Sequence, residues 1–245
     1  IILVTATEHL PHQEKWVEKL TERVPQVETI VHNVNGKRTN VILGPKNSVL
    51  YGDGTITDHI KDLQFTLSPH SFFQVNPEQT TVLYDQALKY ADLKGNETVI
   101  DAYCGTGTIS LFLAHKAKHV IGIEIVEPAI INARENARHN GYDNTEFIVA
   151  DAAVEMPKLY KAGVRPDVIV FDPIRAGCKE EVLTSAAGME PKRIVYVSCN
   201  PATMARDIEI LTHYGYELQE VQPVDMFPMT AHVEAVALLT RNEET

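Results

Sequence analysis

The rhythm of hydrophobic and polar positions changes along this chain of 245 residues and divides it into two regions. Residues 1–67 carry short apolar runs separated by turn residues, which is the pattern of a small α+β unit. A helix is predicted over 11–23, and an Asn35-Gly36 pair marks a turn. Short strands are predicted over 1–6, 27–32 and 56–63 and near Val41 and Val49. No catalytic pattern stands out in this first region.

Residues 68–245 form the second region, in which strands and helices alternate. A joining segment over 68–77 leads into a predicted helix over 78–90. Apolar strands then follow over 99–100, 120–125, 145–149, 168–171 and 194–197. Helices between them indicate βαβ units and a parallel sheet with both faces covered. The last two predicted strands, 216–224 and 233–240, have no long helix between them, so we expect an antiparallel pair at a sheet edge.

Composition is that of an ordinary globular protein, with 44% hydrophobic residues. No apolar run approaches the roughly 20 residues that a membrane-spanning helix needs, and no signal peptide is visible. We therefore expect a cytoplasmic protein without a membrane partner. The chain starts at Ile1, inside a predicted strand, and we expect it to be a fragment of a longer protein.

The three cysteines, Cys104, Cys178 and Cys199, are far apart and form no C-x-x-C pair. This spacing predicts neither a zinc site nor a disulfide framework, and it fits a reducing compartment. The formal net charge of −11 argues against a broad nucleic-acid-binding face, because phosphate contacts need Lys and Arg. It leaves room for a local basic groove, or for a basic module elsewhere in the protein.

A glycine-rich turn follows the predicted strand at 99–100, where residues 101–108 read Asp-Ala-Tyr-Cys-Gly-Thr-Gly-Thr. Glycines at such a turn let the backbone approach a ligand closely at the carboxyl edge of a sheet. Glu124, 19 residues past Gly105, ends the next strand, where an acid can bind both ribose hydroxyls of an adenosine. Asp151 follows the third strand, in a position to read an adenine amino group. An ordinary tight turn is the alternative, which Glu124 makes less attractive.

A dinucleotide-dependent oxidoreductase is the competing interpretation of the same turn. Its fingerprint wants a third glycine at position 110, where this chain has Ser110. The Asp-x-x-Cys-Gly-x-Gly form instead looks like the first motif of class I methyltransferases.

Two further segments follow apolar strands at the same predicted edge. In Asp172-Pro173-Ile174-Arg175, Asp172 could orient a cofactor or a base, and Arg175 could hold a phosphate or a carbonyl. The alternative is a helix N-cap followed by Pro at the first helical position. Cys199 follows the strand at 194–197 and precedes Asn200-Pro201, where a helix N-terminus would lower the thiol pKa. A buried core role is the alternative for a cysteine, but it suits Cys104 and Cys178 better.

Five motifs now stand in order along the chain. They are Phe72-Phe73-Gln74-Val75-Asn76, Asp101-x-x-Cys104-Gly105-x-Gly107, Asp172-Pro173-x-Arg175, Ser198-Cys199-Asn200-Pro201-x-Thr203-x-x-Arg206-Asp207 and Asp225-Met226-Phe227-Pro228-x-Thr230-x-His232-x-Glu234. Together they resemble the RNA uracil-5-methyltransferase family, which methylates C5 of uridine in ribosomal or transfer RNA. The resemblance runs from about residue 68 to the end. It implies a class I, Rossmann-like fold with a mostly parallel seven-stranded sheet and an antiparallel terminal strand; residues 1–67 resemble the family's central domain.

The resemblance also implies site residues and a cofactor, S-adenosyl-L-methionine. Cys199 would be the nucleophile that adds to C6 of uracil, and Glu234 the base that removes the C5 proton. The residues implied in cofactor binding are Gln74, Tyr103, Gly105, Thr108, Glu124, Asp151 and Asp172. Arg175, Phe227 and His232 would contact the substrate base, which should be flipped or in a loop because a stacked base could not reach Cys199.

The sequence departs from the family in two places. The family usually has Pro or Ala where Ile174 stands, and nothing here corresponds to its N-terminal RNA-binding β-barrel or to the iron–sulfur cysteines of some members. We expect a monomer that acts on RNA, with 23S ribosomal RNA as the leading substrate and transfer RNA as the alternative. A cytosine-C5 RNA methyltransferase and a non-catalytic RNA-folding scaffold are the other hypotheses.

Overall fold

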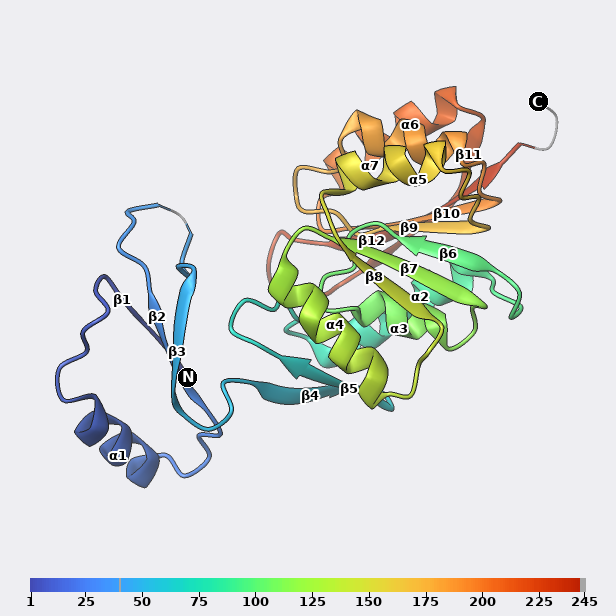
Figure 1. The fold of residues 1–245 in the computed structure, drawn as a ribbon. Coiled ribbons are helices and arrows are strands. Elements are labelled where there is room, and N and C mark those ends of the chain that lie inside the picture. The colour runs from blue at the N-terminus through green and yellow to red at the C-terminus, as the bar shows by residue number, and fades with distance from the viewer. Residues whose placement is uncertain (40, 243–245) are drawn as a thin grey trace. The chain divides into compact units, whose positions relative to one another are not determined.

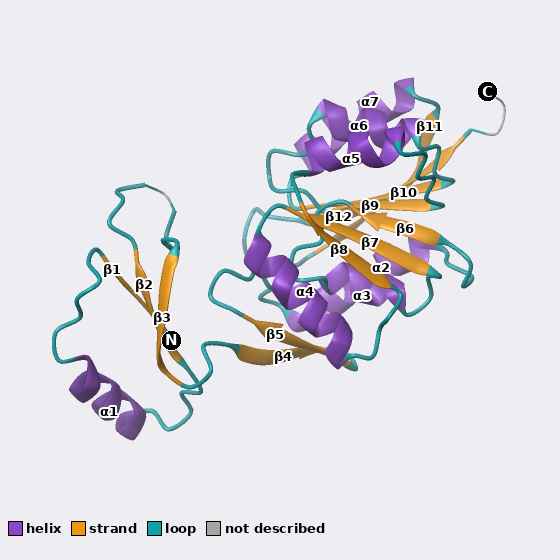
Figure 2. Ribbon diagram, viewed as in Figure 1, coloured by secondary structure: helices purple, strands orange, loops and turns teal. Residues whose placement is uncertain are grey.

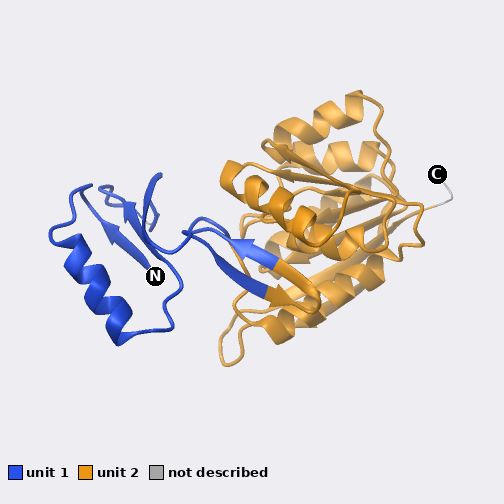
Figure 3. Cartoon of the chain, turned by 60° about the horizontal axis from the view of Figure 1, so that its bottom comes forward, with its two compact units in different colours: residues 1–58, 65–71 blue, residues 59–64, 72–245 orange. Residues whose placement is uncertain are grey.

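The computed structural model describes residues 1–39 and 41–242. These residues form two compact units, coloured separately in Figure 3. One unit consists of residues 1–58 and 65–71, and the other of residues 59–64 and 72–245. The expected domain boundary between residues 67 and 68 stays a prediction.

The first unit is built on a three-stranded sheet in the order β1-β2-β3. Its elements are β1 (Ile2–Thr5), α1 (Gln13–Arg23), β2 (Ile30–Val34) and β3 (Lys46–Tyr51). Strands β1 and β2 are parallel, as expected for two strands joined through a helix, and β3 is antiparallel to β2. The central strand β2 is the buried one, with its first four residues inaccessible to solvent.

Two expectations for this part of the chain are wrong. Residues near Val41 form no strand, because the side-chain amide of Asn35 donates to the carbonyls of Val41 and Ile42 at 2.7 and 2.9 Å and holds them in a loop. Residues 56–63 are not one strand but the start of a hairpin, β4 (Ile56–Ile60) and β5 (Leu63–Leu67). The chain reverses at Lys61, whose φ of 53° lies in the left-handed region.

The second unit contains a seven-stranded sheet in the order β11-β12-β10-β9-β6-β7-β8. Its strands are β6 (Thr98–Asp101), β7 (His119–Glu124), β8 (Thr145–Val149), β9 (Val168–Phe171), β10 (Arg193–Ser198), β11 (Tyr216–Val224) and β12 (Glu234–Arg241). Strands β6 to β10 are mutually parallel where they pair, and β12 is antiparallel to both β10 and β11. This confirms the mostly parallel sheet with an antiparallel pair at its edge.

Helices cover both faces of this sheet, as Figures 1 and 2 show. The layer with α2 (Pro77–Ala91), α3 (Thr108–Ala114) and α4 (Glu127–His139) lies on one face. The layer with α5 (Ala152–Lys161), α6 (Glu180–Gly188) and α7 (Pro201–His213) lies on the other. All four residues of β9 are buried, because a central parallel strand packs against helices on both sides.

The carboxyl edge of this sheet gathers the residues that the sequence singled out. Strands β6, β7 and β10 end there at Asp101, Glu124 and Ser198, and Asp172 follows the last residue of β9. Strand β12 runs the opposite way and therefore begins at this edge, at Glu234. Ligands of open α/β sheets bind at the carboxyl ends of the strands, so this edge is the place to look for a site.

Candidate active site

Cys199 and Glu234 meet at the boundary between β10 and β12. Ser198 pairs with Ala235 in the antiparallel ladder, so the next pair outward brings Cys199 opposite Glu234. Cys199 is partly exposed, whereas Glu234 is only 4% exposed. The negative charge of Glu234 is felt at the thiol, where it helps to raise the pKa of Cys199. A thiol and a carboxyl group, 35 positions apart in sequence, thus lie at the same point of the sheet edge.

The electrostatic surroundings of Cys199 differ from those expected at a helix N-terminus. Burial raises the pKa of the Cys199 thiol, and the carboxylates of Glu234 and Asp172 raise it further, while Arg175 acts in the opposite direction. Helix α7 begins just beyond, but its first residue is Pro201, which has no N–H, and the Asn200 side chain accepts the Ala202 N–H at 3.2 Å. Burial and nearby acids therefore raise the pKa of Cys199 even though a helix begins just beyond it.

A group of buried and partly buried acids lies at this edge of the sheet. Burial raises the pKa of Asp172 to about 8, with help from Glu234 and Asp101. The pKa of Asp101 rises to about 6, again mainly through burial, although its carboxylate accepts a 2.6 Å hydrogen bond from Ser110. Burial also raises the pKa of Glu234, which Arg175 opposes. The site is therefore built so that its carboxyl groups hold protons more tightly than in water.

Tyr84 is a residue that sequence reasoning missed. It is buried on α2, its hydroxyl lies 3.1 Å from Oγ1 of Thr108, and its pKa is raised by burial and then by the charge of Asp172. It thereby connects α2 to the first residue of α3, within reach of the charge of Asp172. Nothing in the local sequence distinguishes Tyr84 from an ordinary core aromatic, so only the fold could reveal it.

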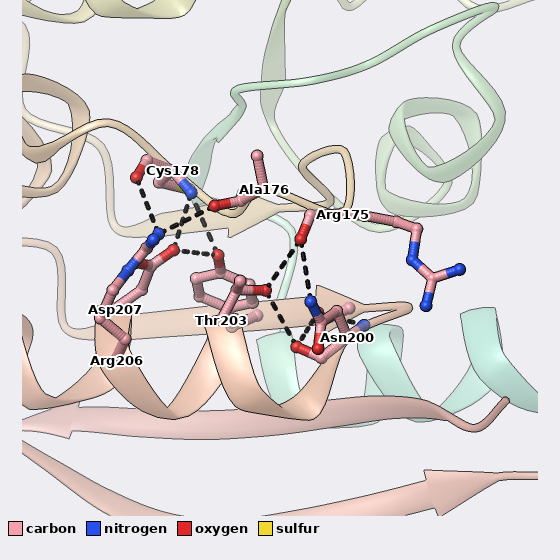
Figure 4. A network of polar contacts seen from close by, with 9 residues as sticks. Arg175, Ala176, Cys178, Asn200, Thr203, Arg206 and Asp207 are labelled. Atoms are coloured by element: carbon pink, nitrogen blue, oxygen red, sulfur yellow. Dashed lines mark hydrogen bonds and ion pairs between the residues drawn. The ribbon is translucent and has the colours of Figure 1, made fainter. Parts of the chain in front are cut away.

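The loop after β9 is bound to the start of α7 by the polar residues of the Ser198–Asp207 motif, as Figure 4 shows. Asn200 donates from Nδ2 to the Arg175 carbonyl at 3.0 Å, and the Thr203 hydroxyl donates to the same carbonyl at 3.3 Å. The Arg175 side chain itself points away from this network. The motif therefore fixes the backbone of the Asp172–Arg175 loop next to Cys199 and leaves the guanidinium available to a ligand.

Asp207 is the buried centre of the same network. Its Oδ2 accepts the backbone N–H of Cys178 at 2.7 Å and the hydroxyl of Tyr196 at 2.6 Å, and its Oδ1 pairs with Arg206 at 2.6 Å. Gly177 lets the loop come this close: a Cβ there would stand 2.6 Å from Oδ2 of Asp207. These contacts explain in structural terms why Arg206 and Asp207 stand in the motif.

The glycine-rich turn has the features of a place for a ligand. Gly105 has a φ of 52°, and a Cβ on it would point into open space. The Glu124 carboxylate stands over this turn, accepting the N–H groups of Gly105 at 3.3 Å and Val126 at 2.8 Å. These backbone donors hold the Glu124 carboxylate in place. The residue is only partly buried, and part of it therefore stays accessible to a ligand. An open glycine beside an anchored carboxylate fits the ribose of an adenosine ligand.

The other residues predicted to bind the cofactor are placed as follows. Gln74 is buried, at 8% exposure. Tyr103 packs against the core, and the neighbouring Cys178 helps burial to raise its pKa. Asp151 caps α5 through the Ala153 N–H at 2.9 Å and also pairs with Lys179 at 2.9 Å, so an adenine amino group would have to share its oxygens. Thr108 is engaged with Tyr84. Their roles toward a cofactor stay predictions.

Phe227 and His232, the predicted base contacts, lie on the loop that connects β11 and β12. Their rings are 6.4 Å apart in an edge-to-face arrangement, with Phe227 partly buried and His232 exposed. The loop is fastened to the N-terminal end of α2, because Asn76 donates from Nδ2 to the Met226 carbonyl at 3.1 Å. This connects the fifth motif to the first, and it places both rings on the loop that leads directly into Glu234.

Within residues 1–39 and 41–242, no three His, Cys, Asp or Glu side chains come together in a group that could hold a metal ion. None of the helices in that part of the chain is long and apolar enough to cross a membrane.

The comparison with protein families decides between the alternatives that the glycine turn left open. Residues 2–242 match the model of the family described as tRNA (Uracil-5-)-methyltransferase. The chain belongs to the tRNA (uracil-5-)-methyltransferase family. The dinucleotide oxidoreductase interpretation is thereby set aside, whereas the catalytic roles of Cys199 and Glu234 stay predictions.

Over the stretch that matches, curated relatives are more than half identical to this member of the family. An uncharacterized RNA methyltransferase of Halalkalibacterium halodurans is 58% identical over 239 residues, which are 98% of this chain and 52% of the relative. One from Clostridium acetobutylicum is 54% identical over 241 residues, again 98% of this chain and 52% of the relative. The chain therefore spans about half the length of the curated relatives that it matches.

Similarity to solved structures identifies the fold of the chain. The tRNA (uracil-54, C5)-methyltransferase of Pyrococcus abyssi, solved in complex with S-adenosyl-L-homocysteine, has a TM-score of 0.77 and 30% identity. The match covers 98% of this chain and 55% of that one. Trm5b of the same organism has a TM-score of 0.62 at 18% identity, covering 98% of this chain and 72% of its own, and shows likeness of fold alone. The class I methyltransferase fold of this family member is thus confirmed.

Proposed function

We propose that this chain is the catalytic part of an S-adenosylmethionine-dependent methyltransferase that modifies C5 of uridine in RNA. The observation that carries the proposal is the ladder register that brings Cys199 opposite Glu234 at the carboxyl edge of the sheet. Family membership supports it, because the matching family is described by this activity. The acids and the glycine turn at the same edge provide the rest of the site.

The residues that would hold the cofactor come from four strand ends and from the segment that precedes α2. Glu124 would bind the ribose hydroxyls above Gly105, Asp172 and Gln74 would lie toward the reacting end, and Asp151 would lie toward the adenine. When bound, S-adenosylmethionine supplies a methyl group from its sulfonium. The complex of the Pyrococcus abyssi enzyme with S-adenosyl-L-homocysteine supports this choice of ligand.

The protein's own residues divide the reaction between them. Uracil C5 is a weak nucleophile, so the Cys199 thiolate adds to C6 and the electron pair of the C5–C6 double bond moves toward C5 and O4. Once C5 carries the new methyl group, Glu234 removes the proton that remains there. The electrons of that C–H bond re-form the C5–C6 double bond, and the bond from C6 to sulfur breaks, which returns the Cys199 thiolate.

Reaching C6 requires a base that has left its stack. The Cys199 thiol lies at the end of a buried strand, and a paired base could not approach it without flipping. Arg175, Phe227 and His232 are the proposed partners of the flipped base: the guanidinium would bind a carbonyl or phosphate oxygen, and the two rings would offer stacking and a hydrogen bond.

The test is methyl transfer to an RNA stem-loop by the full-length protein. Cys199→Ala should abolish transfer, whereas Cys178→Ala, a change at a buried cysteine in the loop after β9, should keep most of it. Glu234→Gln should let a covalent protein–RNA adduct accumulate, detectable as a slower band in a denaturing gel, because the C5 proton cannot leave. Full activity in Cys199→Ala would refute the mechanism.

The product separates the hypotheses that remain. Labelling of cytidine instead of uridine would favour a cytosine-C5 methyltransferase, which shares the cysteine chemistry. RNA binding and refolding without turnover would favour a non-catalytic RNA-folding scaffold.

Among RNA substrates, we propose 23S ribosomal RNA as the first candidate. The name of the Pyrococcus abyssi enzyme makes transfer RNA the second candidate. Mass spectrometry of nucleosides from each RNA class, in cells with and without the protein, separates the two.

A further inference from the structure

Met229 is held in a conformation that its residue type does not favour. The turn from Phe227 to Thr230 is closed by the Thr230 N–H donating to the Phe227 carbonyl at 3.2 Å. Pro228 occupies its second position, and Met229, with a φ of 68°, occupies its third. These are the marks of a type II turn, whose third position favours glycine. A non-glycine residue kept at positive φ is a reason to look for a function.

The unfavourable backbone conformation of Met229 is not offset by packing of its side chain. It is fully exposed, at 102% of its reference area, although it is apolar. The turn around it is well fixed, since the Thr230 hydroxyl also donates to the Phe227 carbonyl at 2.7 Å and accepts the His232 N–H at 3.1 Å. The apolar side chain of Met229 is thus exposed to solvent on a turn that is fixed by hydrogen bonds. This turn lies in the loop that leads into β12 at Glu234.

Ile174 is a second apolar side chain of the same kind. It is 78% exposed, and its loop is held by the bonds from Asn200 and Thr203 to the carbonyl of the next residue, Arg175. It follows β9, whereas Met229 precedes β12, and these two strands flank β10 on its two sides. The nucleophile Cys199, which follows β10, therefore lies between two fixed loops that each present an exposed apolar side chain.

We propose that Ile174 and Met229 are wedges that enter the RNA base stack on the two sides of the uridine delivered to Cys199. This inference rests on the proposed function, since it takes RNA as the partner. A flipped base leaves a gap in the stack, and apolar side chains are what proteins insert to fill such a gap. The net charge of −11 makes phosphate contacts a weak source of RNA affinity for this chain. It therefore favours base stacking on apolar side chains as the way in which these loops bind RNA.

The Met229→Gly variant tests the wedge without endangering the fold. Glycine suits the third position of the turn, so this change should keep or raise the melting temperature while it removes the side chain. Ile174→Ala is its counterpart on the other loop, and Met229→Leu should retain function. Tyr214→Ala is the matched control, because Tyr214 is 51% exposed but follows the far end of α7, away from Cys199.

Two measurements on the full-length protein test whether Ile174 and Met229 act as wedges. The first is kcat/KM for methylation of a uridine in a structured stem-loop against the same uridine in a short unstructured RNA. We expect Met229→Gly and Ile174→Ala to lose about tenfold or more on the stem-loop and less than threefold on the unstructured RNA. Tyr214→Ala should match the wild type on both. Equal losses on the two RNAs, or no loss, would overturn the wedge.

The second readout does not depend on methyl transfer. With 2-aminopurine next to the loop uridine, binding of the Cys199→Ala protein should raise fluorescence as the neighbouring bases unstack. The same rise in Met229→Gly/Cys199→Ala would count against the wedge, and its loss would support it. If the wild type unstacks the RNA but methylates nothing, the proposed function fails while the wedge stands.

Discussion

Ser198 and Ala235 are paired in the antiparallel ladder of β10 and β12, and this register sets Cys199 against Glu234. The pairing depends on one strand that ends and another that begins at the same edge of the sheet. An all-parallel sheet could not bring a residue that follows one strand next to the first residue of its neighbour. The reversed last strand is thus what brings the proposed nucleophile and the proposed base together.

The pH dependence of activity should reveal the charge of Arg175. Burial and two carboxylates raise the pKa of Cys199, and Arg175 alone among the named charges opposes them. The reactive thiolate therefore forms as pH rises, and Arg175→Met should move that limb of the kcat/KM profile to higher pH. We expect roughly a three- to tenfold lower rate at pH 7 with recovery at higher pH. Arg175→Lys, which keeps the charge, should shift the limb much less; an unshifted profile in Arg175→Met would contradict this account.

Asp172 should make the unliganded protein less stable as pH rises from about 4 to about 8. Its ordinary pKa is 3.8, and in the folded protein it is about 8. Below both values the carboxyl is protonated in either state and costs nothing. Between them only the unfolded chain releases its proton, which favours unfolding, and above both the penalty stays constant.

Asp172→Asn should remove this penalty. The neutral isostere should raise the free energy of unfolding at pH 8 by about 2 kcal/mol, a value well below the full pKa difference because the carboxyl keeps some contact with solvent. Melting temperatures at pH 4.5 and pH 8 measure it: the variant's gain should be present at pH 8 and almost vanish at pH 4.5. Asp167→Asn, just before the start of β9 and so at the opposite edge of the sheet, is the control. Equal gains at both pH values would contradict the assignment.

Glu124 should govern cofactor affinity. Its carboxylate is anchored by the Gly105 and Val126 N–H groups and stays partly accessible. Glu124→Gln removes the charge that two ribose hydroxyls would donate to, and we expect the Kd for S-adenosyl-L-homocysteine to rise about ten- to a hundredfold. Titration calorimetry measures this, with Glu127→Gln, an exposed acid in the first turn of α4, as the control. Unchanged affinity in Glu124→Gln would remove it from the cofactor site.

Asp207 should be a structural requirement of the site. It is fully buried and accepts hydrogen bonds from the Cys178 backbone and the Tyr196 hydroxyl while it pairs with Arg206. Asp207→Ala leaves those donors without a partner and should cost about 2 to 4 kcal/mol of stability. Thermal unfolding measures the cost, and Glu209→Ala, an exposed acid two positions on, should change it by less than about 0.5 kcal/mol. A small effect at Asp207 would show that the loop is fixed in another way.

Local pattern was enough for much of the second unit. Five apolar strands alternating with helices predicted a parallel sheet, and the two final strands without a helix between them predicted its antiparallel edge. It was less effective between Asn35 and Leu63, because a side chain and a turn decided the outcome there. Asn35 holds Val41 and Ile42 in a loop, and the chain reverses at Lys61 within a stretch that reads as one strand.

The sequence by itself determined the strand ends at which Glu124, Asp172 and Cys199 stand, because periodicity and glycine turns are local properties of the chain. Only the tertiary structure decided how those ends interact. The register of β10 and β12 placed Glu234 beside Cys199, and burial among carboxylates raised a thiol pKa that a helix N-terminus alone would have lowered. Hydrogen-bond register and desolvation depend on residues far apart in sequence, so no local pattern carries them.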